Sequence, residues 1–137
     1  MKKVFVDTDI ILDLLSQREP FYKFSANLFS AADKNEIKIY VSALSFTNLI
    51  YMLSKQFSAD QARKKLLKFK TLVTVLAVTD KTIELALASD FKDFEVGVQY
   101  FSAIEGGVKI LLTRNLKDYK SAEIPVMTSE MFLQSGE

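Results

Sequence analysis

Two aspartates, Asp7 and Asp118, lie far apart in the chain, and each comes shortly after an apolar segment. Carboxylates are ligands that hard divalent cations such as Mg²⁺ and Mn²⁺ prefer. A cation held in this way lowers the pKa of a bound water and stabilises charge on a phosphate. The two side chains are therefore candidates for a site that hydrolyses phosphodiester bonds.

The composition excludes several other kinds of chemistry, because the 137-residue chain contains no histidine and no cysteine. Catalysis by Ser-His-Asp or Cys-His groups, zinc bound by histidine or thiolate, and disulfide bonds are all excluded. The net charge of +1 attracts no polyanion by itself, so contact with nucleic acid must depend on local basic clusters.

No apolar stretch approaches the roughly 20 residues that a membrane helix needs. The apolar start of the chain, Val4–Val6, is too short for a signal peptide and runs straight into Asp7. We therefore expect a cytoplasmic protein with no membrane segment.

Alternation and helical spacing of apolar residues predict which elements position the two acids. Val4–Val6 indicates a first strand, Ile10–Leu15 a first helix, and Pro20 the first position of a second helix. Further strands are predicted at 37–41, 72–78, 108–112 and 124–127, and further helices at 43–53, 62–69, 80–88 and 93–105. Ser42, Ser58 and Asp80 are the expected helix caps. Pro125 indicates that the last strand lies at an edge of the sheet.

Strands that alternate with helices predict one α/β domain over residues 1–137, a three-layer α/β/α fold with a central, mostly parallel sheet. Ligands bind such sheets beyond the carboxyl ends of the strands. Asp7 follows the first strand, and Asn115 and Asp118 follow the strand that ends at Leu112. If these strands are neighbours, the three side chains share a crevice. Asp9 fits either metal contact or a helix cap.

Two segments carry a family resemblance. Residues 4–13, Val-Phe-Val-Asp-Thr-Asp-Ile-Ile-Leu-Asp, resemble the opening signature of PIN domains, small metal-dependent ribonucleases that include the toxins of VapBC toxin-antitoxin systems. Residues 112–119, Leu-Thr-Arg-Asn-Leu-Lys-Asp-Tyr, resemble the late strand-and-acid motif of the same family. Segments 18–21, 41–44 and 93–95 resemble a bacterial branch of it, in matching order over nearly the whole chain.

The resemblance implies a site of three or four acids, of which this chain keeps only part. Asp7 matches the first acid, and Asn115 with Asp118 matches the last pair. Asn48 stands where many members have a glutamate, and Val96 where they usually have an aspartate. An amide oxygen can bind a metal but brings no charge.

A neighbour of Val96 can replace the missing acid only if it lies on the same face of the helix. Glu95 is about 100° away around a helix and is expected to point elsewhere, whereas Asp93, three residues earlier, and Gln99, three residues later, lie on nearly the same face. Asp93 is therefore the candidate substitute. Its alternative role is to cap this helix.

Contact with RNA requires basic or polar groups near the acids. Arg114 and Lys117 lie within the late motif and are candidates to hold phosphates. Ser42, at a strand end, is a candidate for either phosphate contact or helix capping. The basic run at 63–65 is expected to be an ordinary solvated helix face.

The leading hypothesis is a Mg²⁺- or Mn²⁺-dependent endoribonuclease of the PIN type, in which Asp7, Asp118 and Asn48 hold the metal, and Asn115 and Asp93 complete the site. If toxin-like, the resemblance implies a homodimer and an antitoxin partner. The alternative is a catalytically weakened PIN-like module that binds RNA or protein, since acids are missing at positions 48 and 96. A receiver domain ranks last, because Val126–Met127 has no following lysine.

Overall fold

The computed structural model describes residues 1–135, and it places a five-stranded parallel sheet at the centre of the molecule. The strands are β1 (Lys2–Val6), β2 (Ile37–Ser42), β3 (Thr74–Leu76), β4 (Leu111–Leu112) and β5 (Val126–Met127). Their order in the sheet is β3-β2-β1-β4-β5, and every neighbouring pair is parallel. The predicted α/β fold is confirmed, and β5 lies at an edge as Pro125 indicated.

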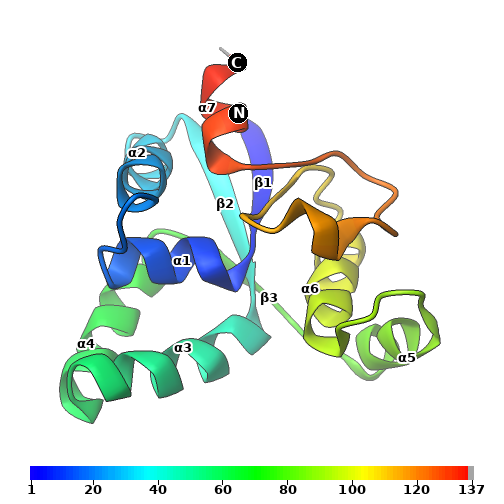
Figure 1. Cartoon of the computed structure of the whole chain (residues 1–137), viewed down its shortest axis with the longest axis horizontal. Coiled ribbons are helices and arrows are strands. Elements are labelled where there is room, and N and C mark those ends of the chain that lie inside the picture. The colour runs from blue at the N-terminus through cyan, green and yellow to red at the C-terminus, as the bar shows by residue number, and fades with distance from the viewer. Residues whose placement is uncertain (136–137) are drawn as a thin grey trace.

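Helices cover both faces of this sheet (Figure 1). They are α1 (Thr8–Leu15), α2 (Tyr22–Asp33), α3 (Ala43–Gln56), α4 (Ala59–Lys70), α5 (Asp80–Ala88), α6 (Phe94–Glu105) and α7 (Ser129–Gln134), with a 3₁₀ turn, η1, at Leu116–Tyr119. Helices α1 to α4 and α7 lie on one side, whereas α6 covers the other side and α5 packs on α6. The result is the expected three-layer arrangement.

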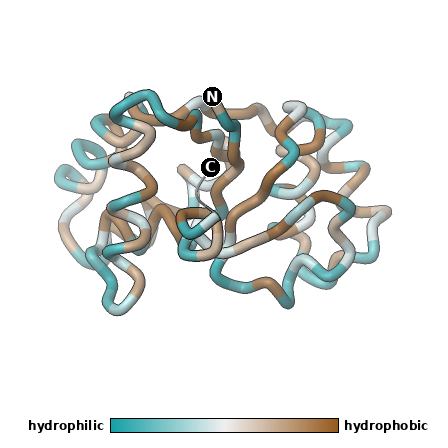
Figure 2. The backbone as a smooth tube through the Cα atoms, turned by 90° about the horizontal axis from the view of Figure 1, so that it is seen from above, coloured by the Kyte–Doolittle hydropathy of each residue, from teal (hydrophilic) through white to brown (hydrophobic). Residues whose placement is uncertain are grey.

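The sheet divides the core because successive side chains of a strand point to opposite faces. In β1, Val4 and Val6 pack against α1 to α4, whereas Phe5 packs against α6. All three side chains are fully buried. Figure 2 shows the hydrophobic segments running through the middle of the molecule. β1 is thus held from both faces, which fixes where its carboxyl end lies.

The pairing of β1 with β4 sets the register at that end. Val6 lies beside Leu112, and the backbone N–H of Asp7 donates to the Leu112 carbonyl at 3.0 Å. The residues that follow each strand, Asp7 and Thr113, are therefore neighbours. β4 is shorter than the predicted 108–112, because the N–H of Val108 donates to the carbonyl of Ala103 and closes the end of α6.

Several local predictions are confirmed and others are wrong. Ser42 and Ser58 cap α3 and α4 as expected. Helix α5 is capped by Thr79, which forms a reciprocal capping box with Thr82, and not by Asp80. α2 begins at Tyr22, beyond Pro20, which lies in the preceding turn. β3 is limited to Thr74–Leu76, and α7 and η1 were not predicted.

Within residues 1–135, no helix has both the length and the apolar character that crossing a membrane requires.

Candidate active site at the carboxyl edge of the sheet

Asp7 lies at the carboxyl end of β1 with only 6% of its surface exposed. It occupies the N-cap position of α1, but its side chain makes no capping hydrogen bond. Instead, one carboxylate oxygen, Oδ2, accepts from the hydroxyl of Thr113 at 2.9 Å and from that of Tyr119 at 3.3 Å. The carboxylate is therefore oriented by two residues from the segment that follows β4.

Burial raises the pKa of Asp7 above its usual value, and the nearby charge of Asp9 acts in the same direction. Hydrogen bonds from Thr113 and Gln99 oppose this rise, because they stabilise the ionised form. Burial and the Asp7 charge raise the pKa of Tyr119 well above its ordinary value. The phenol therefore stays protonated at neutral pH and remains a hydrogen-bond donor to Asp7.

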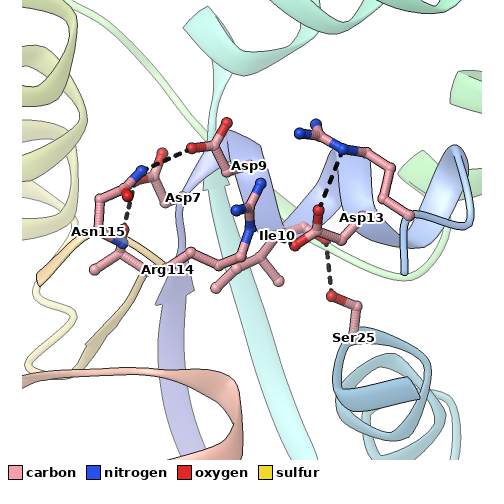
Figure 3. Close-up of polar contacts among 9 residues, drawn as sticks. Asp7, Asp9, Ile10, Asp13, Ser25, Arg114 and Asn115 are labelled. Atoms are coloured by element: carbon pink, nitrogen blue, oxygen red, sulfur yellow. Dashed lines mark hydrogen bonds and ion pairs between the residues drawn. The ribbon is translucent and has the colours of Figure 1, made fainter. Parts of the chain in front are cut away.

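Asn115 and Arg114, in the same segment, each contact a different acid of α1 (Figure 3). The amide of Asn115 donates to Oδ2 of Asp9 at 3.1 Å. The Nε of Arg114 lies 2.7 Å from Oδ2 of Asp13. The side chain of Asp9 therefore accepts a hydrogen bond from the segment that follows β4.

A cluster of buried polar side chains surrounds Thr8, the residue that follows Asp7. The hydroxyl of Thr8 lies 2.7 Å from the hydroxyl of Ser45. The backbone N–H and the hydroxyl of Thr8 both donate to Oε1 of Gln99, each at 3.2 Å. These contacts join the starts of α1 and α3 to α6, so three helices meet at this edge of the sheet.

Glu95 contacts the position where the resemblance placed a glutamate. The amide of Asn48 donates to Oε2 of Glu95 at 3.2 Å. Glu95 thus points in a different direction from Val96, as expected, but it contacts Asn48, which was not predicted. Val96 instead packs in the apolar cluster around Phe5 and Tyr100. Glu95 lies four residues before Gln99 on α6, and this spacing is the signal that could have identified Glu95.

Asp93 and Asp118 lie together in a pocket of about 210 Å³, which is lined by three aspartates and three lysines. Asp93 caps α6 by accepting from the backbone N–H of Val96 at 3.2 Å, so the capping alternative is confirmed. Asp118 is exposed on η1. The charges of Asp7 and Asp118 both raise the pKa of Tyr119. Asp118 is at the same edge as Asp7 but contributes to the neighbouring pocket.

The sequence model of the PIN domain family matches residues 3–117. The chain belongs to the PIN domain family. It is 31% identical over 141 residues to Ribonuclease VapC1 of Aquifex aeolicus, which covers 97% of this chain and 94% of that protein.

Solved structures share the PIN fold at lower identity. A toxin-antitoxin complex from Klebsiella pneumoniae contains a chain with a TM-score of 0.68 and 20% identity, covering 92% of this chain and 97% of that one. The structure of VapBC2 from Rickettsia felis, bound to a DNA fragment from its promoter, contains a chain with a TM-score of 0.65 and 18% identity. The match covers 91% of this chain and 96% of that one. These likenesses concern the fold.

The remaining candidates for RNA contact in this PIN domain have different surroundings. Ser42 is fully buried, and its hydroxyl accepts from the N–H of Leu44 at 3.1 Å. Phosphate contact by Ser42 is therefore contradicted, and capping accounts for it. Arg114 is partly buried and paired with Asp13, whereas Lys117 is exposed in the pocket that contains Asp118.

The donor groups of this edge decide how well a divalent cation fits. Among residues 1–135, no group of three Asp, Glu, His or Cys side chains is arranged to hold a metal ion. Asp7 and Asp9 with the amide of Asn115 supply two carboxylates and one neutral oxygen. Mg²⁺ is commonly held by one or two carboxylates and keeps several waters. The residues therefore fit an open, partly hydrated cation site and not a closed cage.

Proposed function

We propose that this PIN domain is a metal-dependent endoribonuclease of the VapC type. The observation that carries the proposal is the buried Asp7 carboxylate, oriented by Thr113 and Tyr119 at the carboxyl end of adjacent parallel strands. A buried, oriented acid of this kind is costly for a fold and typical of a reactive centre. The likeness to Ribonuclease VapC1 supports RNA as the substrate class.

Asp7 and Asp9 would hold a Mg²⁺ or Mn²⁺ ion, with Asn115 as a neutral ligand. We retain Asp118 in the proposed site because it lies on η1 directly before Tyr119, whose hydroxyl bonds to Asp7. Asn48 would contribute through its pairing with Glu95. When bound, the cation would supply Lewis acidity and an activated water. Tyr119 and Thr113 keep the Asp7 carboxylate in one orientation.

Cleavage of RNA by purified protein tests this proposal. We expect single-stranded RNA to be cut in Mn²⁺ and to stay intact when EDTA removes the metal, because the proposed water is activated only by the cation. Isothermal titration with Mn²⁺ alone gives a second measurement, and weak binding is expected from only two adjacent carboxylates. Cleavage that persists in EDTA would contradict a metal-dependent reaction.

The lysines of the Asp118 pocket would guide RNA to this edge. Lys92, Lys117 and Lys120 line that pocket together with Asp118. Basic side chains that neutralise phosphates supply most of the salt-dependent affinity for nucleic acid. Their position next to η1 would place the RNA backbone within reach of the acids.

Replacing Lys92, Lys117 and Lys120 by alanine should weaken RNA binding at every sequence. The slope of log affinity against log salt should fall in magnitude by roughly two, at about 0.7 for each phosphate contact to a single strand. Fluorescence anisotropy across a salt series measures it. Lys64, Lys68 and Lys70 of α4 are the matched control, since they lie on the exposed helix face away from this pocket. An equal loss in both triple variants would indicate only a general charge effect.

A second candidate, an RNA-binding or protein-binding module with little catalysis, is favoured by the lack of a three-acid group among residues 1–135. Binding of RNA without cleavage in Mn²⁺ would support it. For either function we propose a homodimer and an antitoxin protein as partners, as the toxin-antitoxin complex from Klebsiella pneumoniae suggests.

A further inference from the structure

Asp13 is a buried acid that the proposed chemistry does not use. Its side chain is 1% exposed, and it faces two arginines: Arg114 at 2.7 Å and Arg18 at 3.7 Å. An unpaired buried carboxylate would be strongly unfavourable, so the two guanidinium groups account for its presence. Asp13 cannot touch a bound RNA, because the protein covers it completely.

Arg114 is held on a second side as well. Its guanidinium carbon lies 4.1 Å from the centre of the Phe21 ring, which is the geometry of a cation–π contact. Arg114 therefore sits between the end of α1 and the start of α2. Figure 3 shows Arg114 beside Asp13, which lies on the same helix as Asp9.

Three successive residues after β4 contact the segment that contains α1. Thr113 donates to Asp7, Asn115 donates to Asp9, and Arg114 between them pairs with Asp13. Asp9 and Asp13 are four residues apart and so lie on one face of the helix, one turn apart. The contact of Arg114 is an ion pair, whereas the contacts of Thr113 and Asn115 are hydrogen bonds to acids of the proposed site.

We propose that the Asp13–Arg114 ion pair is a positioning device that keeps Thr113 and Asn115 on Asp7 and Asp9. This inference rests on the proposed ribonuclease function, and it replaces direct RNA contact as the main role of Arg114. Fixing Arg114 on both Asp13 and Phe21 restrains the backbone on either side of it. The carboxylate of Asp7 then keeps its orientation when RNA binds.

Steady-state kinetics and amide hydrogen exchange test the device in Arg114→Met, Arg114→Lys and Asp13→Asn. We expect kcat to fall by about a hundredfold in Arg114→Met and Asp13→Asn with KM for RNA little changed, the typical cost of a misplaced group. Arg114→Lys should recover part of the loss, because it keeps the charge next to Asp13. Lys64→Met, which breaks the exposed pair with Asp60, is the control.

Amide hydrogen exchange measures how often the segment after β4 opens, and it requires neither RNA nor metal. The N–H of Asn115 bonds to the Thr113 hydroxyl and that of Asp118 to the Asn115 carbonyl. Both should exchange about tenfold faster or more in Arg114→Met, as local opening depends on the few contacts that hold a loop. The amide of Leu66, in the remote helix α4, should not change and reports any global loss of stability.

The outcomes separate the inference from the proposed function. A raised KM and a smaller salt slope in Arg114→Met, with Asp13→Asn unaffected, would overturn the inference and make Arg114 an RNA contact. Unchanged exchange at Asn115 and Asp118 would overturn it even if no cleavage is found. Faster exchange at both amides without RNA cleavage in the parent protein would leave the positioning role intact and remove the ribonuclease.

Discussion

Replacing Asp7 by asparagine should abolish metal-dependent RNA cleavage. We expect a loss of about a thousandfold, because a bound cation contributes several kcal/mol of transition-state stabilisation and about 1.4 kcal/mol corresponds to tenfold in rate. Asparagine keeps the size of the side chain and an oxygen for Thr113, so the fold should be preserved. Cleavage by equal amounts of both proteins, measured in Mn²⁺, checks this. Undiminished cleavage by the variant would mean that a contaminant cuts the RNA.

The same substitution should make the protein more stable at neutral pH. Because burial raises the folded-state pKa of Asp7, the folded protein binds this proton more tightly than the unfolded chain does. Stability from Asp7 is therefore greatest at low pH and falls as the pH rises from the unfolded pKa through the folded one. Above that window the ionised Asp7 lowers stability, and asparagine removes this cost.

Thermal melting at two pH values measures the effect. The melting temperature of Asp7→Asn should exceed that of the parent at pH 7, and the difference should be smaller at an acidic pH below the raised folded-state pKa of Asp7. Asp60→Asn is the control, since Asp60 is an exposed acid. A difference that stays the same at both pH values would show that charge is not its cause.

Introducing an acid at position 96 should destabilise the protein strongly. Val96 is 8% exposed and packs with Phe5 and Tyr100, so Val96→Asp would place a carboxylate in an apolar cluster. An uncompensated buried charge typically costs about 3–5 kcal/mol. Urea unfolding should show this loss, with Val96→Thr much less affected. A Val96→Asp protein as stable as the parent would mean that the new acid reaches water.

Mn²⁺ distinguishes a core position from one that faces the cation site. Val98 is 1% exposed on the same helix, and Val98→Asp should be destabilised to a similar extent. If position 96 faces only the core, Mn²⁺ should stabilise neither variant more than the parent. A cation bound by the new acid at 100 times its Kd would instead restore about 2.7 kcal/mol. Such a rescue in Val96→Asp alone would show that position 96 faces the site.

The polar site residues that directly follow strands could be predicted from two elementary rules. Alternating strands and helices require a parallel sheet, and parallel strands end at the same edge. Asp7 and Asn115 come directly or almost directly after β1 and β4, so their proximity required only that these strands be neighbours. The pairing of Val6 with Leu112 meets that condition. Asp118 is further along the chain, and the unpredicted turn η1 directs it towards the adjacent pocket.

Side chains that depend on packing between helices could not be predicted in the same way. The pairing of Glu95 with Asn48 depends on how α6 is rotated against α3, which no local pattern specifies. Asp13 was read only as part of a motif, and its burial follows from arginines supplied by two other segments. Tyr119 belongs to the late motif, but no sequence pattern predicts that its phenol bonds to Asp7. Tertiary contacts decided all three.

The position of β1 in the middle of the sheet has a consequence for synthesis of the chain. Thr113 and Tyr119 lie 106 and 112 residues after Asp7 in the sequence. They are therefore synthesised long after Asp7, and domains generally fold once their segments have emerged from the ribosome. A nascent chain therefore carries Asp7 without the partners that orient it for most of its translation. The proposed activity can therefore arise only after residue 119 has been synthesised, so products that terminate before residue 113 should be inert.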